Sequence, residues 1–451
     1  MNMRTFLTWV LCGFMMTVSG ARAQHPSTLP HQAAGQSIGT VNCSSSMCHG
    51  SVVPWKESIV LRNEYTTWSR LDKHSQAYNV LLNPTSQRIA KNLGLKEPAH
   101  EAKVCLDCHA HYPPEQQRGA RFQFKEGVSC EACHGPAGPW IEGHVEKGAT
   151  HRNNIAHGLY PLSKPIDQAK LCLSCHVGDA SRFVTHRMMG AGHPRMSFEL
   201  TTFTAMGPSH FNVDDDYRSR KGAFEPVRVW ALGQVLAVQT QLDALMDPHR
   251  NYDGVFPELV LFDCHACHRP MAEQRWTSHM GTPPGVIRLN QGHLVMLKTL
   301  VTVFAPSSSD ELDMALKQLN QALYTKAQSG SVPWQNAARA LRAFAEKMLP
   351  VLEKVTLDRQ SRMKILLALI DASRISGYAD YSNAEQAYMA IIGVVHGLLL
   401  DGSIKLTPDM RATLSNLKLS LAHDEKYSVK LFEQHLTLFR NQLAKPPGAP
   451  R

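Results

Sequence analysis

The sequence predicts a mainly α-helical protein in two parts. The N-terminal part is rich in cysteine and histidine and has few strands, and a helical bundle follows it. Ten of the 11 cysteines lie between Cys43 and Cys267. Beyond about residue 287 the chain has no cysteine and consists of amphipathic segments joined by short polar loops, which is typical of a helical bundle. A length of 451 residues with 43% hydrophobic residues excludes a disordered chain and provides for buried cores.

The first 23 residues have the three parts of a secretory signal peptide. Arg4 supplies the positive charge, residues 5–19 are apolar, and Ala21-Arg22-Ala23 is a small-residue cleavage site. Lipoprotein processing at Cys12 is disfavoured, because residues 9–11 lack the usual small side chains. We therefore expect cleavage before Gln24 and a periplasmic protein. No later stretch reaches the roughly 18 apolar residues of a membrane span.

Four copies of the motif C-x-x-C-H follow. They are Cys105-Leu106-Asp107-Cys108-His109, Cys130-Glu131-Ala132-Cys133-His134, Cys172-Leu173-Ser174-Cys175-His176 and Cys264-His265-Ala266-Cys267-His268. This motif is the attachment signature of c-type haem. The two thiols form thioethers to one haem, and the histidine then lies under the iron as the proximal ligand.

Disulfides and structural zinc are the alternatives to haem. At this composition only roughly 0.01 matches to the motif are expected by chance, so four matches are a strong signal. A disulfide has no use for a histidine after every second cysteine. Zinc would require the cysteine pairs to converge on shared tetrahedral sites. The motifs therefore predict covalent haem.

A fifth, looser site is Cys43-Ser44-Ser45-Ser46-Met47-Cys48-His49, whose spacer has four residues. A longer loop can bulge and still present both sulfur atoms. The alternative is a local disulfide beside an incidental histidine. The histidine is in place and every other mature cysteine already belongs to a haem pair, so we expect five haem c groups.

The haems also change how the net charge of the chain should be interpreted. The formal net charge is +9, and removal of residues 1–23 takes away Arg4 and Arg22 and leaves +7. Each haem with ionised propionates adds about −1 when ferric and −2 when ferrous. The basic residues mostly balance these propionates, so we expect no nucleic-acid partner.

The apolar periodicity predicts the helices of the second part. A helix is expected over residues 226–246, before the last attachment motif begins at Cys264. The segments 287–304, 310–328, 333–355, 357–375, 382–400, 407–422 and 426–443 follow. The predicted domains are the signal peptide (1–23), a multihaem cytochrome domain (24–285), a helical bundle (286–445) and a tail (446–451). We expect residues 290–445 to fold without haem.

The chain has more histidines than the irons can bind. Only five of the 23 histidines follow an attachment pair, and at most five sixth positions on the irons remain for the others. His74 is the first candidate for a sixth ligand, since a helix over residues 68–81 would place it on an apolar face with Leu71, Tyr78 and Leu81. The other candidates are His144, His186, His193 and His210. Met188, Met189, Met196 and Met206 are weaker alternatives.

Three runs resemble the multihaem cytochromes of the cytochrome c-554 family. They are residues 68–81, residues 127–135 around Cys130-Glu131-Ala132-Cys133-His134, and residues 186–200 with Gly192-His193-Pro194. The resemblance spans roughly residues 40–280. It implies a periplasmic electron carrier with closely stacked, mostly bis-histidine haems, an axial role for His74, and plausible axial roles for His144, His186 and His193. The Cys43–His49 site and the long helical C-terminal domain depart from this family pattern.

The leading hypothesis is a respiratory electron carrier rather than an enzyme, with redox partner proteins that the sequence does not identify. Its protein part would fix haem spacing, exclude water and tune potentials. The alternative is a multihaem oxidoreductase that acts on a small nitrogen or sulfur compound at a five-coordinate haem. A third hypothesis, compatible with the first, makes the bundle a docking module for a membrane quinol complex or an outer-membrane partner.

Overall fold

The computed structural model describes residues 28–254, 257–268, 288–329, 334–375 and 377–444. The expected signal peptide and the expected tail lie outside these residues. Helices make up 61% of the structure. Only two isolated bridges, Ser37 with Arg118 and Phe262 with Leu289, occur in the described ranges, and those ranges contain no strand. The mainly α prediction is therefore confirmed.

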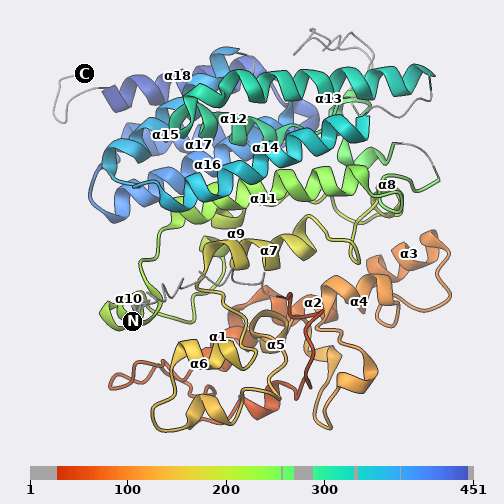
Figure 1. The fold of residues 1–451 in the computed structure, drawn as a ribbon, viewed down its shortest axis with the longest axis vertical. Coiled ribbons are helices and arrows are strands. Elements are labelled where there is room, and N and C mark those ends of the chain that lie inside the picture. The colour runs from red at the N-terminus through yellow and green to blue at the C-terminus, as the bar shows by residue number, and fades with distance from the viewer. Residues whose placement is uncertain (1–27, 255–256, 269–287, 330–333, 376, 445–451) are drawn as a thin grey trace, which may run out of the picture.

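Most of the N-terminal part forms the lower half of the molecule in Figure 1, while the segment around residues 186–190 reaches up beside the longer helices. It consists of short helices joined by long irregular segments, which suits a region whose core is completed by cofactors rather than by side chains. The helices are α1 (Glu64–Leu71), α2 (Ala77–Leu81), α3 (Pro84–Leu93), α4 (Lys103–His109), α5 (Cys130–His134), α6 (His151–Ala156), α7 (Pro165–His176), α8 (His186–Gly190), α9 (Leu200–Met206) and α10 (Asp215–Lys221).

The upper half in Figure 1 is a bundle of longer helices. Its members are α11 (Pro226–Met246), α12 (Gly292–Phe304), α13 (Ser309–Ser329), α14 (Trp334–Lys354), α15 (Arg359–Asp371), α16 (Tyr381–Leu400), α17 (Pro408–Leu419) and α18 (Val429–Ala444). The sequence periodicity predicted each of these helices to within a few residues at each end. No helix among the described residues is both long and apolar enough to cross a membrane.

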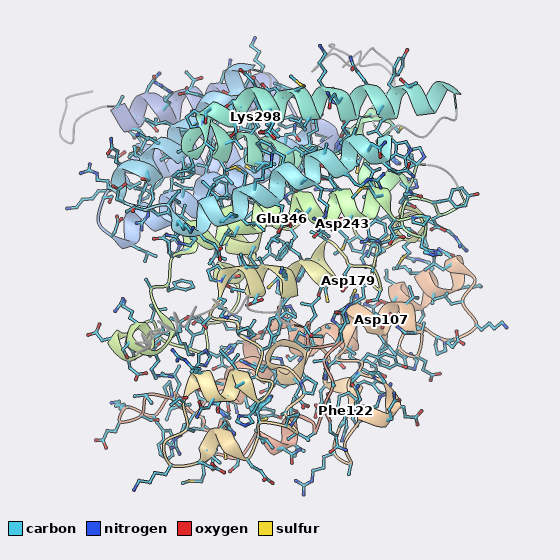
Figure 2. All side chains as sticks on the ribbon, viewed as in Figure 1. Asp107, Phe122, Asp179, Asp243, Lys298 and Glu346 are labelled. Carbon is cyan, nitrogen blue, oxygen red and sulfur yellow. The ribbon has the colours of Figure 1, made fainter. Side chains whose placement is uncertain are left out.

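Helix α11 connects the two halves. Pro226 occupies its first turn, where a missing N–H costs no hydrogen bond, and the Glu225 carboxylate accepts the backbone N–H of Val227. The helix is buried almost all round, with Trp230 and Leu245 at 1% and 0% exposure. Arg342 of α14 donates to Asp243 at 2.6 Å on one side of it (Figure 2).

The apolar core of the bundle begins well before residue 286. It is continuous from Ala169 and Leu173 on α7, through Phe198 and α11, to Phe439 on α18. A much smaller cluster around Leu106 serves the region of α2 to α4. The domain boundary expected between residues 285 and 286 stays a prediction. The core that α7 and α11 share with the later helices offers a specific way to test it.

The expected continuous helix over residues 68–81 is wrong. Helix α1 ends at Leu71, and Asp72 is extended. The Asp72 carboxylate accepts the backbone N–H of His74 at 2.9 Å and starts the 3-10 turn η2 (Lys73–Gln76). A short polar side chain that bonds the backbone two residues ahead competes with helix continuation, which the apolar periodicity did not reveal.

Candidate haem sites

The five motif histidines each face one other histidine across a gap of nearly constant width. Every partner is one of the five candidates for the opposite ligand. The ring centres lie 6.4 Å apart in His49–His144, His109–His193 and His134–His210, and 6.2 Å apart in His176–His74 and His268–His186.

The width of these gaps fits a metal ion between two imidazoles. Imidazole nitrogens bind first-row metals at about 2 Å, as zinc does. Two such bonds, with about 1 Å from each nitrogen to its ring centre, place the ring centres about 6 Å apart. The residues present therefore fit an iron held between two histidines at each of the five positions.

Local helix geometry presents three of the attachment motifs. The motifs that end in His109, His134 and His176 form the last turns of α4, α5 and α7. Residues three apart on a helix lie on the same face, so both cysteines and the following histidine can point to one side. The last motif instead uses the 3-10 turn η7 (Cys264–Ala266), and the Cys43–Cys48 loop follows the 3-10 turn η1 (Thr40–Asn42).

Hydrogen bonds fix the orientation of several of these rings. The Nδ1 atom of His49 lies 2.9 Å from Glu64 Oε2, and that of His74 lies 3.0 Å from Asp72 Oδ1. The Nδ1 atom of His109 lies 3.0 Å from the carbonyl oxygen of Ala77. His144 and His193 make the same kind of Nδ1 contact to the carbonyls of Ile141 and Pro194. When Nδ1 carries the proton, Nε2 is free to bind a metal, and such outer contacts are typical of metal-bound histidines.

Burial sets the charge of the rings inside the site. It lowers the pKa of His134 to about 3 and that of His176 to about 4. Both rings are therefore neutral at pH 7, and a neutral imidazole is the form that binds metal. His49 behaves differently, because the hydrogen bond that its ring donates to the Glu64 carboxylate raises its pKa. The carboxylates Glu64 and Asp72 were not singled out from the sequence, since nothing in their spacing marks them as neighbours of a ligand.

Four of the five pairs surround one large cavity of about 2290 Å³. Ordinary small-molecule pockets hold about 300–1,000 Å³, so this space is large enough for a ligand well above that class. The cavity is lined by the eight histidines of the four pairs and by Cys43, Cys105, Cys108, Cys130, Cys133, Cys172 and Cys175. Seven attachment cysteines and the eight histidines of these four pairs thus line the same space.

The attachment motifs also lie close to one another. The thiol of Cys43 contacts that of Cys130, and the thiol of Cys108 contacts that of Cys175. Groups attached at these motifs would lie with their edges near each other, which is what electron transfer between them needs. Among the described residues, no cluster of three or more potential ligands could hold a single metal ion. The zinc alternative therefore has no candidate site there.

The fifth pair lies outside this cavity, between α8 and η7. His186 opens α8, and its backbone N–H donates to Glu258 Oε1 at 2.7 Å. Glu258 also caps the 3-10 turn η6 (Leu259–Leu261), which leads to the last motif. One carboxylate thus holds the two histidine-bearing segments together.

Arg182 is a buried residue of the cavity wall that the sequence did not reveal. Its guanidinium donates to the carbonyl oxygen of Asp107 at 3.0 Å and to Cys175 Sγ at 2.9 Å. It also contacts the ring of His31 and pairs with Asp179 at 3.6 Å (Figure 2). Arg182 therefore braces two attachment motifs against the N-terminal segment of the described chain.

Other histidines have ordinary structural partners. His293 is held by the side chain of Gln234 at 2.8 Å, and Ser37 Oγ lies 2.9 Å from Nε2 of the buried His111. The methionines considered as alternative ligands, namely Met188, Met189, Met196 and Met206, are not part of the five ring pairs.

Comparison with known proteins gives one family match. The family model of cytochrome c554 and c-prime matches residues 42–135. No curated protein and no solved structure matches. The resemblance to the cytochrome c-554 family is therefore supported, over a shorter region than the expected 40–280. The match begins at residue 42 and includes the Cys43–His49 site, which we had expected to be a departure from the family. It indicates a c-type cytochrome with covalently bound haem c that takes part in electron transfer.

Proposed function

We propose that this chain, which resembles the cytochrome c-554 family over residues 42–135, is a periplasmic pentahaem cytochrome that passes electrons between redox partners. The ten cysteines from Cys43 to Cys267 attach five haems. The proximal ligands are His49, His109, His134, His176 and His268. The opposite ligands are, in the same order, His144, His193, His210, His74 and His186.

The observation that supports this proposal is the complete pairing of the two sets of histidines. Each motif histidine has one partner, no partner is shared, and the five ring separations span only 6.2 to 6.4 Å. Some of these rings also contact aromatic side chains, as His176 does Phe198 at 4.3 Å, but those contacts vary more in distance and do not recur at each motif. A series of metal sites with one common ring separation accounts for the pattern.

The chain's own residues would hold and insulate the redox groups. Bound haem supplies the one-electron Fe(III)/Fe(II) couple. Glu64, Asp72 and the carbonyl of Ala77 orient imidazoles through Nδ1 and tune the basicity of the metal-binding nitrogen. The adjacent attachment cysteines keep neighbouring haems close. Burial of His134 and His176 keeps water from the ligands and favours transfer within the protein.

The alternative, an oxidoreductase that binds a small nitrogen or sulfur compound, requires an iron with an open position. The five pairs leave no motif histidine without an opposite histidine, so the electron carrier is favoured. Carbon monoxide binding to the dithionite-reduced protein separates the two functions. We expect no change in the Soret band, since all five irons are six-coordinate. A carbon monoxide complex formed by one of the five haems would support the oxidoreductase instead.

We further propose that the bundle helices provide a docking surface for a redox partner, either a membrane quinol complex or an outer-membrane protein. The bundle supplies no haem ligand, so its size calls for another role. Electron transfer to a soluble acceptor should continue when bundle surface residues are changed. Transfer from membrane vesicles that contain quinol should slow. Equal rates from membranes for wild type and surface variants would contradict docking through the bundle.

A further inference from the structure

A buried polar network joins the last attachment motif to the bundle. His265, which lies between Cys264 and Cys267, faces Asp263 at 3.8 Å and Asp424 at 3.5 Å. Its ring centre lies 5.3 Å from that of Tyr381, at the start of α16. The attachment loop between Cys264 and Cys267 is thus in direct contact with residues of the C-terminal part.

Two carboxylates in this network share one guanidinium. Arg288 Nη2 lies 2.6 Å from Asp380 Oδ1 and 3.3 Å from Asp263 Oδ2. The side chains of Asp263, Asp380 and Arg288 are only 3%, 14% and 12% exposed. Asp263 immediately precedes Cys264, so Asp380 is one side chain away from the haem-bearing loop.

The pKa values of the two carboxylates are shifted in opposite directions. Burial and the nearby charge of Asp263 raise the pKa of Asp380 to about 6, although Arg288 opposes the shift. Asp263 has the hydrogen bond with His265 as well as Arg288, and these outweigh its burial and lower its pKa. When two acids share one base, only one of them is easily ionised, and the second is ready to take up a proton.

We propose that Asp380 is the proton acceptor coupled to reduction of the haem at Cys264 and Cys267. The bundle is then part of the redox unit. One electron from a one-electron donor takes that haem from Fe(III) to Fe(II), and one proton from solvent binds the Asp380 carboxylate. The added negative charge is thereby neutralised nearby. Among the described residues, the charged groups that act on Asp380 are Asp263, His265 and Arg288 on the haem side, and Tyr427 faces it from the bundle side.

This inference rests on the proposed function, because it needs a haem at Cys264 and Cys267. Asp380 is not a neighbour in sequence of His268 or His186. Its proton affinity therefore reports on the charge of the haem through Arg288 and Asp263, rather than on ligation.

The test is proton uptake on full reduction of the five-haem protein, measured with a pH indicator in weakly buffered solution between pH 6 and 8. Asp380→Asn should lower the uptake by a substantial part of one proton per molecule. Asp313→Asn is the matched control, since Asp313 pairs at 2.6 Å with Lys298 (labelled in Figure 2) and its side chain is 49% exposed. It should leave the uptake unchanged.

Redox titration gives a second readout. In wild type, one of the five potentials should fall as pH rises, with a slope approaching about 59 mV per tenfold change in proton activity for a one-electron couple. In Asp380→Asn that slope should flatten and the other four potentials should stay the same. Asp380→Glu should restore it. Equal uptake and equal slopes in wild type and Asp380→Asn would overturn the proposal.

Infrared difference spectra of wild type keep the test valid if the Asp380→Asn protein does not fold. Reduction should produce a protonated carboxyl band near pH 7, and its absence would also overturn the proposal. Failure of the proposed function is distinguishable, because the proteolytic peptide that contains Cys264 and Cys267 would then carry no haem in its mass spectrum. A protein with five haems and no Asp380-dependent proton uptake contradicts this inference alone.

Discussion

The ring of His74 lies 6.2 Å from the ring of His176, although the two residues come from distant parts of the chain. His74 is held in place by Asp72, whose carboxylate accepts both its backbone N–H and the proton of Nδ1. His176 ends α7 and stacks on Phe198 with ring centres 4.3 Å apart. Both rings are therefore fixed independently of each other, and the gap between them is preformed.

Replacement of His74 by alanine should convert one of the five haems from low spin to high spin without unfolding the protein. The change removes one axial nitrogen, while Asp72 can still bond the backbone N–H of residue 74. Electron paramagnetic resonance of the oxidised protein measures the conversion. His157→Ala is a suitable control, because His157 is exposed and its ring bonds only the carbonyl of Asn153 in the described part of the chain. An unchanged spectrum for His74→Ala would mean that His74 is not a ligand.

The helical bundle without α11 should have an open apolar groove. Trp230, Leu242 and Leu245 of α11 are buried in the common core. We therefore expect residues 290–445 to bind a peptide of residues 224–248 and to gain thermal stability from it, as measured by circular dichroism. A peptide with Leu242→Asp should not bind. If residues 290–445 are equally stable without the peptide, the predicted boundary at residue 285 is supported instead.

Acidification should weaken the interactions that hold Arg182 in place, because it protonates the carboxylate of Asp179. Burial raises the pKa of Asp179, but the hydrogen bonds from His31 and Ser181 and the charge of Arg182 outweigh it and hold the pKa well below its usual range. A depressed folded-state pKa stabilises the protein above the unfolded pKa of about 4, and this stability is lost as pH falls through the folded value.

Asp179→Asn should therefore lower the free energy of unfolding by about 1–3 kcal/mol at pH 7, as expected for a partly buried, charged hydrogen-bonding group. The difference from wild type should shrink below about pH 4. Urea unfolding followed by circular dichroism at pH 7 and pH 3 measures both values. A constant difference at the two pH values would show that Asp179 does not act through its charge.

Much of the fold could be predicted from the sequence, because the relevant signals are local. The bounds of α11 match the predicted 226–246, since Pro226 opens the helix and apolar residues continue to Met246. The attachment motifs are equally local. Which distal histidine faces which motif could not be predicted, because the His176–His74 and His134–His210 pairs depend on how the irregular segments fold back. The role of α11 in the bundle core was missed for the same reason.

Two errors have identifiable physical causes. The break at Asp72 depends on a side-chain hydrogen bond to the backbone of His74, which competes with the helical periodicity of the neighbouring residues. The second error is an omission: His31 was not singled out from the sequence, yet it contacts Arg182 and lies 3.3 Å from Asp179. Long-range contacts of single polar residues leave no periodic signal in a sequence.

The central claim is that five haems are covalently attached, including one at the Cys43–Cys48 loop. The intact mass of the exported, denatured protein tests it most directly, because each covalent haem adds a fixed increment to the chain that starts at Gln24. The account predicts a mass equal to the chain of residues 24–451 with five haems. A mass with four haems and two fewer hydrogens, from Cys43 and Cys48 oxidised to each other, would contradict it.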